Sequence, residues 1–558
     1  MTVTPNYLAT NGSGGTIAAV ANGVAAGNSG TAAAIPSGAA AGGGGGGQTQ
    51  PLRFAIPNNS IAQNSGWPVS GTQTDGLSRM KITIGSGDRS YLVLSFYGWN
   101  MTAAALTLQP NAYTVVGCYL EKGDGSQSVQ VTFDGGSGTK VINAGDTDIQ
   151  SDRIQPSSFT STSVFARDST WFVRLQVRAA TGNLPGGTML YTDLGFPAQV
   201  GLRIDPAVYV SSTVGGTGNM PATGSGWTDN YKAPYLPIAL GPFVSGDPVT
   251  ILGIGDSIIA GAGDNATSVP VHGSFQRALF NTDLATGAIG GCNMGSSGAV
   301  GSLWQGTNAA LGKAYWKYAK HAVEEFGTNE FLNVGSGTAG QATCTLNWTA
   351  LRAAGIQSIV RPLLTPRVTG TSIAAANISG SGTTVTISNV SSAFVALIGT
   401  AGATKTLALQ GVTPSGYNTT TNGATFTVVD ATTLSYSNTT TGAASGTAIT
   451  LNDLYTTTGG QSPLNSSWQS GGGAWNLNDW LPTQVGSSGP TTIVSLNSVR
   501  AGTTPDTTLY YTWAVDGTAY KYVFADNATA GPTLGVHPST FGHTAEAVEY
   551  RTAFAALT

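Results

Sequence analysis

The 558 residues of this chain predict about three to four domains, because a single domain usually holds about 100–200 residues. Lys, Arg, Asp and Glu make up only 9% of the sequence, against about 25% in an ordinary soluble protein, which disfavours long solvated helices and coiled coils. The net charge of −4 excludes a basic surface that would hold nucleic acid or an anionic membrane. No apolar run reaches the about 18 residues that a membrane-spanning helix needs.

Residues 1–52 form a low-complexity arm rich in Gly, Ala and Ser, and Arg53 is the first charged residue. Such a segment buries too little apolar surface to offset its ordering entropy. We therefore expect it to be flexible in isolation or to become ordered inside a larger assembly. The first residues lack the basic and apolar regions of a signal peptide, so we expect an extracellular or virion location to be reached by another route.

Residues 53–245 alternate short apolar and polar runs with turns rich in Gly, Asn and Asp, as in KITIGSG and SVQVTFDGG. A period of two with frequent turns predicts an antiparallel β-sandwich. We interpret its residues Tyr97, Trp99 and Trp171 as core residues, with stacking on sugars as the alternative. The proline-bearing stretch 232–248 is interpreted as a linker.

Beyond residue 245 the expected strands alternate with helices, which predicts a mainly parallel sheet in an α/β domain. Between residues 368 and 452 the pattern is strand-like throughout, so we predict a small β-domain inserted there, with the α/β domain divided into 246–367 and 453–558. The expected strands are 249–255, 288–293, 321–326, 356–364 and 491–497, and the expected helices are 274–280, 307–321, 346–355, 475–481 and 541–557.

The three cysteines, Cys118, Cys292 and Cys344, lie too far apart for a disulfide framework or a metal site. We therefore interpret them as small buried apolar residues. No cofactor and no metal is implied by the sequence.

The candidate nucleophile is Ser257, in a Gly-Asp-Ser sequence that directly follows the first α/β strand. The reactive crevice of an open α/β sheet lies at the carboxyl ends of its strands, where this serine is expected. Asp256 is interpreted as shaping the turn through hydrogen bonds. The alternative interpretation of this tripeptide is a turn that ends the strand and has no catalytic role.

A serine nucleophile needs a base, and the chain has only four histidines. His537 is the candidate, because it lies in a loop just before the last helix that can return to the edge of the sheet. His272 and His321 are interpreted as structural. His543 is interpreted as capping or packing the last helix.

Four sequence blocks together resemble the SGNH, or GDSL-type, hydrolase family. They are 255–257 (GDS), 293–298 (NMGSSG), 327–330 (GTNE) and 534–539 (LGVHPS), which occur in the family's order and each after the expected element. The resemblance implies a three-layer, flavodoxin-like α/β fold. It also implies Ser257 as nucleophile, His537 as base, and an oxyanion hole formed by the amides of Ser257 and Gly298 with the side chain of Asn329.

The chain departs from this family at two positions. Leu534 stands where the family carries the acid of the triad, and Glu330 replaces an aspartate in the third block. The acid normally orients the imidazole and stabilises its protonated form. A backbone carbonyl or another carboxylate could take that role; Asp526 is the nearest acid upstream, but no motif supports it. An inactive, degenerate hydrolase scaffold is the alternative.

The preferred interpretation is a serine esterase that removes acyl groups, such as O-acetyl, from a surface polysaccharide. The expected partners are an acylated polysaccharide or a small ester, and neither nucleic acid nor a membrane; a homo-oligomer or a virion assembly is left open. The alternative is a structural or adhesive virion component, such as a fibre or decoration protein, with an inert hydrolase fold. Residues 411–437 favour a virion setting, because they resemble small β-modules of phage and prophage virion proteins.

Overall fold

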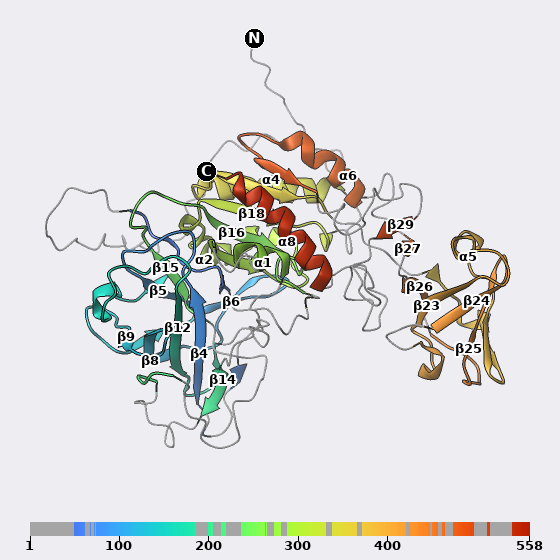
Figure 1. Ribbon diagram of the computed structural model, residues 1–558, viewed down its shortest axis with the longest axis horizontal. Coiled ribbons are helices and arrows are strands. Elements are labelled where there is room, and N and C mark those ends of the chain that lie inside the picture. Colours follow the sequence, from blue (N-terminus) through green and yellow to red (C-terminus); the bar gives the residue numbers. More distant parts are fainter. Residues whose placement is uncertain are drawn as a thin grey trace, which may run out of the picture. The chain divides into compact units, whose positions relative to one another are not determined.

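The computed structural model describes most of the chain beyond residue 49 (Figure 1). The described ranges are 50–61, 67–68, 72, 74–185, 199–204, 214–218, 236–262, 264, 273–280, 287–330, 337–364, 371–419, 424–446, 449–455, 460–463, 473–495, 510–513, 538 and 540–557. The predictions for the amino-terminal arm, His272, Asp526, Leu534 and His537 lie outside these ranges. Within them, no helix is long and apolar enough to cross a membrane.

Two antiparallel sheets occupy the region where a sandwich is expected (Figure 1). The first has the spatial order β1 (Arg53–Phe54), β15 (Ile238–Gly241), β5 (Val93–Phe96) and β11 (Ile149–Gln150). The second has the order β10 (Lys140–Ile142), β8 (Tyr113–Lys122), β12 (Thr170–Arg178), β4 (Asp75–Thr83) and β14 (Gln199–Ile204), and β9 (Ser128–Gln130) pairs with β8. Tyr97, Trp99 and Trp171 are buried in the apolar core, as expected of core residues.

Shorter elements complete this region. They are the hairpin of β6 (Trp99–Met101) and β7 (Leu106–Leu108), the pair β3 (Trp67–Pro68) and β13 (Asn183–Leu184), and the 3-10 turn η1 (Pro156–Ser158). The prediction that 232–248 is a linker is wrong, because β15 is fully buried and pairs with both β1 and β5. Pro237 and Pro242 flank this strand rather than interrupt it, so its backbone donors stay available for the ladder.

The α/β region contains a six-stranded sheet in which all neighbours pair in parallel. Its order is β2 (Asn59–Ser60), β17 (Gly290–Gly295), β16 (Thr250–Gly255), β18 (His321–Glu325), β19 (Ser358–Pro362) and β28 (Thr492–Val494). Without β2, the strands follow the order 2-1-3-4-5 of flavodoxin-like sheets. The edge strand β2 follows β1 in the chain and precedes every other strand of the two antiparallel sheets.

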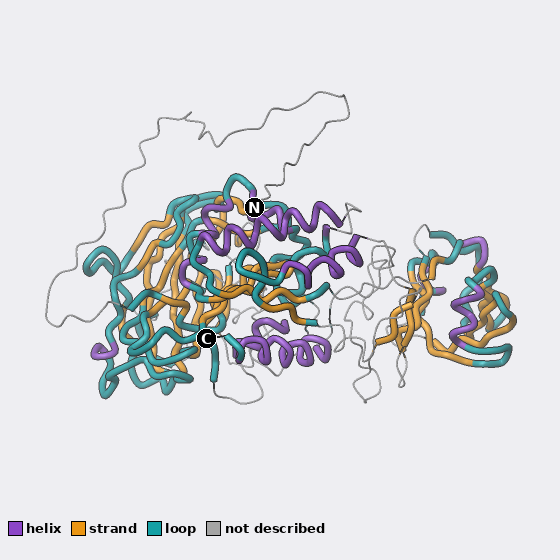
Figure 2. The backbone as a smooth tube through the Cα atoms, turned by 90° about the horizontal axis from the view of Figure 1, so that it is seen from above, coloured by secondary structure: helices purple, strands orange, loops and turns teal. Residues whose placement is uncertain are grey.

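Helices cover both faces of this sheet (Figure 2). Ile251 and Val323 point to a core shared with α1 (Gly273–Phe280) and α8 (Thr540–Ala555). Their neighbours along the same strands, Leu252 after Ile251 and Ala322 before Val323, point to the opposite core, which contains residues of α4 (Gly337–Ala353) and α6 (Gly473–Trp480). This alternation is the period of two that a strand buried on both faces imposes. A 3-10 turn, η9 (Leu481–Gln484), follows α6.

The predicted helix 307–321 is only partly correct. The structure has a short helix α2 (Ala309–Lys313), preceded by η4 (Gly301–Gln305) and followed by η5 (Trp316–Tyr318). Ala310 in α2 is exposed, whereas Tyr315 and Trp316, which are adjacent in the sequence, are both buried. Burial of Tyr315 against Tyr97 and Trp99 of the antiparallel region, and of Trp316 against Trp304, outweighs the local preference for a continuous helix.

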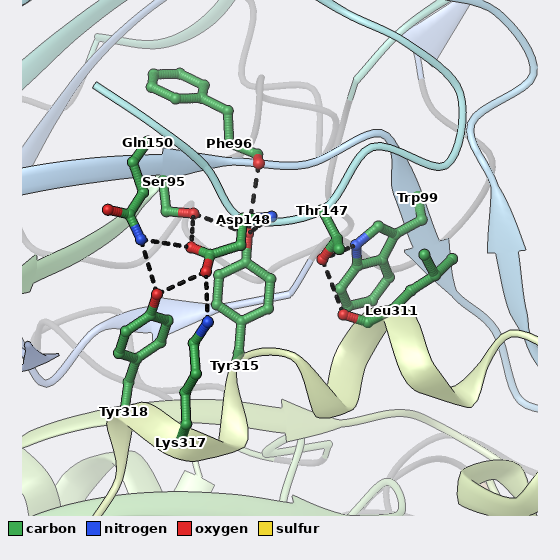
Figure 3. A network of polar contacts seen from close by, with 10 residues as sticks. All are labelled: Ser95, Phe96, Trp99, Thr147, Asp148, Gln150, Leu311, Tyr315, Lys317 and Tyr318. Atoms are coloured by element: carbon green, nitrogen blue, oxygen red, sulfur yellow. Dashed lines mark hydrogen bonds and ion pairs between the residues drawn. The ribbon is translucent and has the colours of Figure 1, made fainter. Parts of the chain in front are cut away.

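A polar network joins η5 to the antiparallel sheets (Figure 3). Ser95 Oγ lies 3.0 Å from Tyr315 Oη, and the Asp148 N–H donates to the same hydroxyl. The carboxylate of Asp148 accepts a hydrogen bond from Tyr318 Oη at 2.6 Å and forms an ion pair with Lys317. The core cluster also runs through both regions without a break, so they fold against one another as a continuous body.

Residues 371–455 form a seven-stranded antiparallel sheet with its own apolar core, and of its described buried residues only Ala408 belongs to the main core cluster. Its order is β20 (Thr371–Ser372), β26 (Thr450–Tyr455), β23 (Thr404–Gln410), β24 (Ala424–Asp430), β25 (Thr433–Ser437), β22 (Thr384–Ile387) and β21 (Ile378–Ser381). Helix α5 (Ser392–Ile398) contributes Phe394 and Val395 to that core, and the 3-10 turns η6 (Ala375–Asn377) and η7 (Ser415–Tyr417) lie in loops. A two-stranded pair, β27 (Gly460–Pro463) and β29 (Tyr510–Trp513), follows it.

Candidate active site

Ser257 lies directly after β16, where the order of the parallel strands reverses. The next strand along the chain, β17, pairs with one side of β16, and β18 pairs with the other. In open α/β sheets, ligands bind outside the carboxyl ends of the strands at such a switch point. Ser257 is 3% exposed, so it is buried at this edge of the sheet rather than open to solvent.

Backbone and carboxylate hydrogen bonds shape the turn that carries Ser257. Asp256 Oδ1 accepts the N–H of Ile258 at 2.9 Å, and the Ala262 N–H donates to the carbonyl of Ser257 at 2.9 Å. Asp256 therefore shapes the turn, as expected from the sequence. A Cβ on Gly255 would lie 2.5 Å from Ile259 Cγ1, so glycine is needed where the turn folds back onto the strand.

The loop after β17 is bonded to this turn. Ser296 N–H donates to the carbonyl of Gly255 at 3.1 Å, and Asn293 Nδ2 donates to the carbonyl of Ile259 at 2.8 Å. Gly298 is exposed at the tip of the loop and has φ +76°, a left-handed conformation that glycine adopts at little cost. The first and second family-like blocks therefore lie side by side.

The loop after β18 completes the arrangement. Asn329 Nδ2 donates to the carbonyl of Ala299 at 2.9 Å, next to Gly298. Glu330 Oε1 accepts the N–H of Gly301 at 2.6 Å, so the longer side chain at the family's aspartate position holds the start of η4. Burial raises the pKa of Glu330. The structure thus brings the loops of Ser257, Gly298 and Asn329 together at the ends of three neighbouring strands.

A buried polar cluster that the sequence analysis missed supports the turn from behind. Arg277 in α1 donates two hydrogen bonds to Asp264, which also accepts the N–H of Gly273 at 2.9 Å. Burial alone would raise the pKa of Asp264, but Arg277, the nearby His543 and Gly273 outweigh it and lower the pKa to about 2. No motif marks this pair in the sequence. Asp264 and Arg277 lie 13 positions apart, a spacing that predicts no contact by itself.

His543 connects three segments behind the turn. Its Nδ1 accepts the N–H of Ser274 at 3.0 Å, and its Nε2 lies 3.0 Å from the carbonyl of Ala262, which fits a proton on Nε2. Both ring nitrogens are therefore used within the fold, and the expected packing role of His543 agrees with this geometry. His321 is also buried, at the opposite end of β18 from the site.

The predicted base, His537, and the acid position, Leu534, lie outside the described residues, so the contact between Ser257 and His537 stays a prediction. Cys118, Cys292 and Cys344 are all buried and form no disulfide, as expected. Among the described residues, no cluster of three or more His, Cys, Asp or Glu side chains is arranged to hold a metal ion.

No protein-family model matches this chain, and no curated protein matches it in sequence. Similar solved structures include AlinE4, an SGNH-hydrolase family esterase, at 19% identity and a TM-score of 0.17. That match covers 22% of this chain and 61% of AlinE4, so this chain spans less than two thirds of that protein.

Two further solved structures resemble a larger part of the chain. A family two carbohydrate esterase from Cellvibrio japonicus has 11% identity and a TM-score of 0.16, over 56% of this chain and 79% of its own. Protein YxiM from Bacillus subtilis has 12% identity and a TM-score of 0.18, over 57% and 65%. Two of these three proteins are esterases. At such TM-scores the likeness by itself assigns neither a fold nor an activity to this chain.

Proposed function

We propose that this chain is a serine ester hydrolase of the SGNH type, with Ser257 as its nucleophile. The observation that carries the proposal is that hydrogen bonds hold three loops together at the switch point of the parallel sheet. Ser257, Gly298 and Asn329 come from these loops, in the order and on the strands where the family-like blocks require them.

In the proposed reaction, Ser257 Oγ attacks the carbonyl carbon of the ester while His537 takes its proton. His537 returns that proton to the leaving alcohol, and water then hydrolyses the acyl-enzyme with the same imidazole as base. The developing oxyanion would accept hydrogen bonds from the amides of Ser257 and Gly298 and from Asn329 Nδ2. The bond from Asn329 to the Ala299 carbonyl fixes the plane of its amide, which preorganises this donor.

The proposed substrate is an acyl group, such as O-acetyl, on a surface polysaccharide, with small esters as accessible model substrates. The antiparallel β-domains that accompany the α/β domain support this choice, because the chain carries much more folded material than a small-ester hydrolase needs. An extracellular or virion location belongs to the same proposal.

The second candidate is a virion fibre or decoration protein whose hydrolase scaffold is inert. The observations that favour it are Leu534 at the acid position, the low content of charged residues and the phage-like stretch 411–437. The two candidates agree if the virion carries an active deacetylase.

Hydrolysis of p-nitrophenyl acetate by the intact chain separates these candidates. We expect the wild type to be active, Ser257→Ala to fall to the background rate, and Ser302→Ala to keep the wild-type rate. Ser302 is a suitable control because it is an exposed serine in η4 of the same domain. A wild type no faster than Ser257→Ala would favour the inert scaffold. Release of acetate from an acetylated polysaccharide then tests the substrate class.

A further inference from the structure

The tip of the β6–β7 hairpin touches the loop that carries Gly298. The Cβ of Ala103 lies 3.3 Å from the position that a Cβ on Gly298 would occupy. Ala103 and Ala104 form the tip of the hairpin, and they and Gly298 are exposed to solvent. An element of the antiparallel region therefore reaches the rim of the candidate active site.

Local hydrogen bonds hold the tip in one conformation. The Thr102 N–H donates to the carbonyl of Ala105 at 3.0 Å, and Thr102 Oγ1 both donates to that carbonyl and accepts the N–H of Ala105. Only Ala103 and Ala104 lie between the two bonded residues. A turn closed in this way positions its side chains without a cost in ordering when a ligand binds.

The hairpin is also anchored on the α/β region. Asn308 Nδ2 donates to the carbonyl of Leu106 at 2.9 Å, and Leu106 Cδ2 lies 2.9 Å from where a Cβ on Gly312 would be. Thr147 Oγ1 accepts a hydrogen bond from Trp99 Nε1 and donates to the carbonyl of Leu311 in α2 (Figure 3). Both strands of the hairpin are thus fixed relative to the segment that follows Gly298.

The chemistry of the tip selects which part of an ester it faces. Ala103 and Ala104 present two methyl groups and no polar side-chain atom. A sugar alcohol would lose hydrogen bonds against such a surface, whereas an alkyl chain loses none. We infer that the Ala103–Ala104 tip forms a wall of the acyl pocket beside the oxyanion hole and limits the length of the acyl group. This inference rests on the proposed esterase function.

Graded modification of a cysteine at the tip tests the inference. Ala103→Cys is treated after folding with methyl or benzyl methanethiosulfonate, and kcat/KM is measured with p-nitrophenyl acetate, butyrate and octanoate. The native cysteines are buried, so the introduced thiol is the accessible target. We expect the benzyl adduct to lower the butyrate and octanoate rates about tenfold relative to acetate, the methyl adduct to have a smaller effect, and dithiothreitol to restore the profile.

The matched control is Ala431→Cys, which places a thiol at an exposed alanine in the turn between β24 and β25. Its adducts should leave the ratio of the three rates unchanged. The double variant Ala103→Gly, Ala104→Gly should change the profile in the opposite direction and raise the octanoate rate relative to acetate.

Two results would overturn the inference while the proposed function stands. One is an active wild type whose acyl-length profile is the same in every hairpin variant and adduct. The other is an equal loss with all three esters, which would mean that the tip restricts entry rather than acyl length. A wild type no faster than Ser257→Ala instead overturns the proposed function, and the inference falls with it.

Discussion

Asp264 and Arg277 form a buried, two-point ion pair directly behind the turn that carries Ser257. Arg277 Nε and Nη2 donate to Asp264 Oδ2 and Oδ1 at 2.7 and 2.8 Å, and neither side chain is more than 3% exposed. Asp264 follows the turn and Arg277 belongs to α1, so the pair sets the position of the turn relative to the helix. The position of the Ser257 turn therefore depends on two buried residues that are not themselves candidate catalytic residues.

Replacing Asp264 with Asn should lower the free energy of unfolding by about 3–5 kcal/mol, because Arg277 would keep a buried charge without its carboxylate. Urea denaturation measures the change. Asp134→Asn is the control, since Asp134 pairs with Lys140 on the surface and its loss should cost less than about 1 kcal/mol. Equal effects of the two substitutions would contradict the importance assigned to the buried pair.

His321 should make the fold less stable as the pH falls from about 6.5 to about 4. Its side chain is buried, both ring nitrogens lack a hydrogen-bond partner in the described part of the chain, and burial together with Lys320 lowers its pKa to about 4. The unfolded imidazole has a pKa of about 6.5, so the unfolded state binds more protons within this window. Stability is complete above the window, and the loss across it reaches about 3 kcal/mol.

Urea denaturation of wild type and His321→Leu at several pH values between 7 and 4 measures this effect. The variant should show a flatter dependence on pH, whatever its absolute stability. Asp264 acts in a separate window, because its lowered pKa removes stability only as the pH falls from about 4 to about 2. An unchanged slope in His321→Leu would mean that other groups control the loss above pH 4.

Leu534→Asp should raise the esterase rate, because a carboxylate at the family's acid position would stabilise the imidazolium that forms when His537 takes the proton. Steady-state hydrolysis of p-nitrophenyl acetate measures it, with Leu534→Asn as a variant of the same size without the charge. An unchanged rate in an enzyme faster than Ser257→Ala would show that another group already orients His537. An inert variant beside an inert wild type would favour the virion scaffold.

Deleting the β-domain of residues 371–455 should leave the rest of the chain folded, because its described core residues other than Ala408 form a cluster separate from the cores of the other regions. Strand β26 runs to Tyr455, so the deletion should remove 368–455 and join the ends with a short Gly/Ser linker. Near-ultraviolet circular dichroism and a cooperative urea transition measure the outcome. Loss of the transition would mean that this segment belongs to the α/β core.

The parallel strands could be predicted from the sequence because a strand buried on both faces is a short, nearly continuous apolar run, as in β16. The continuous helix predicted for 307–321 was wrong, since the burial of Tyr315 depends on Tyr97 and Trp99 of the antiparallel region, which the local sequence does not reveal. Strand β15 could not be predicted from the sequence, because Pro237 and Pro242 flank it and prolines usually indicate a loop.

The loops of Ser257, Gly298 and Asn329 were predicted together because parallel strands end at one edge, and a motif after each strand therefore indicates neighbours in space. The contact of Ala103 with Gly298 had no such signal. It joins segments from different regions of the chain through packing alone, and an alanine in a turn looks like any other exposed residue.

Strand β2 has a consequence for how this protein can be cut or assembled. It follows β1 and precedes every other strand of the antiparallel sheets in the chain, yet it pairs with β17 at the edge of the parallel sheet. The Asn59 side chain also ties β2 to β15 of the first antiparallel sheet, because it accepts the N–H of Ala239 and donates to the carbonyl of the same residue. A gene fragment that starts at residue 246 would leave the edge of β17 unpaired, which invites edge-to-edge aggregation. On the ribosome, likewise, the first strand of this sheet must await the synthesis of its partner, long after the sandwich strands have emerged.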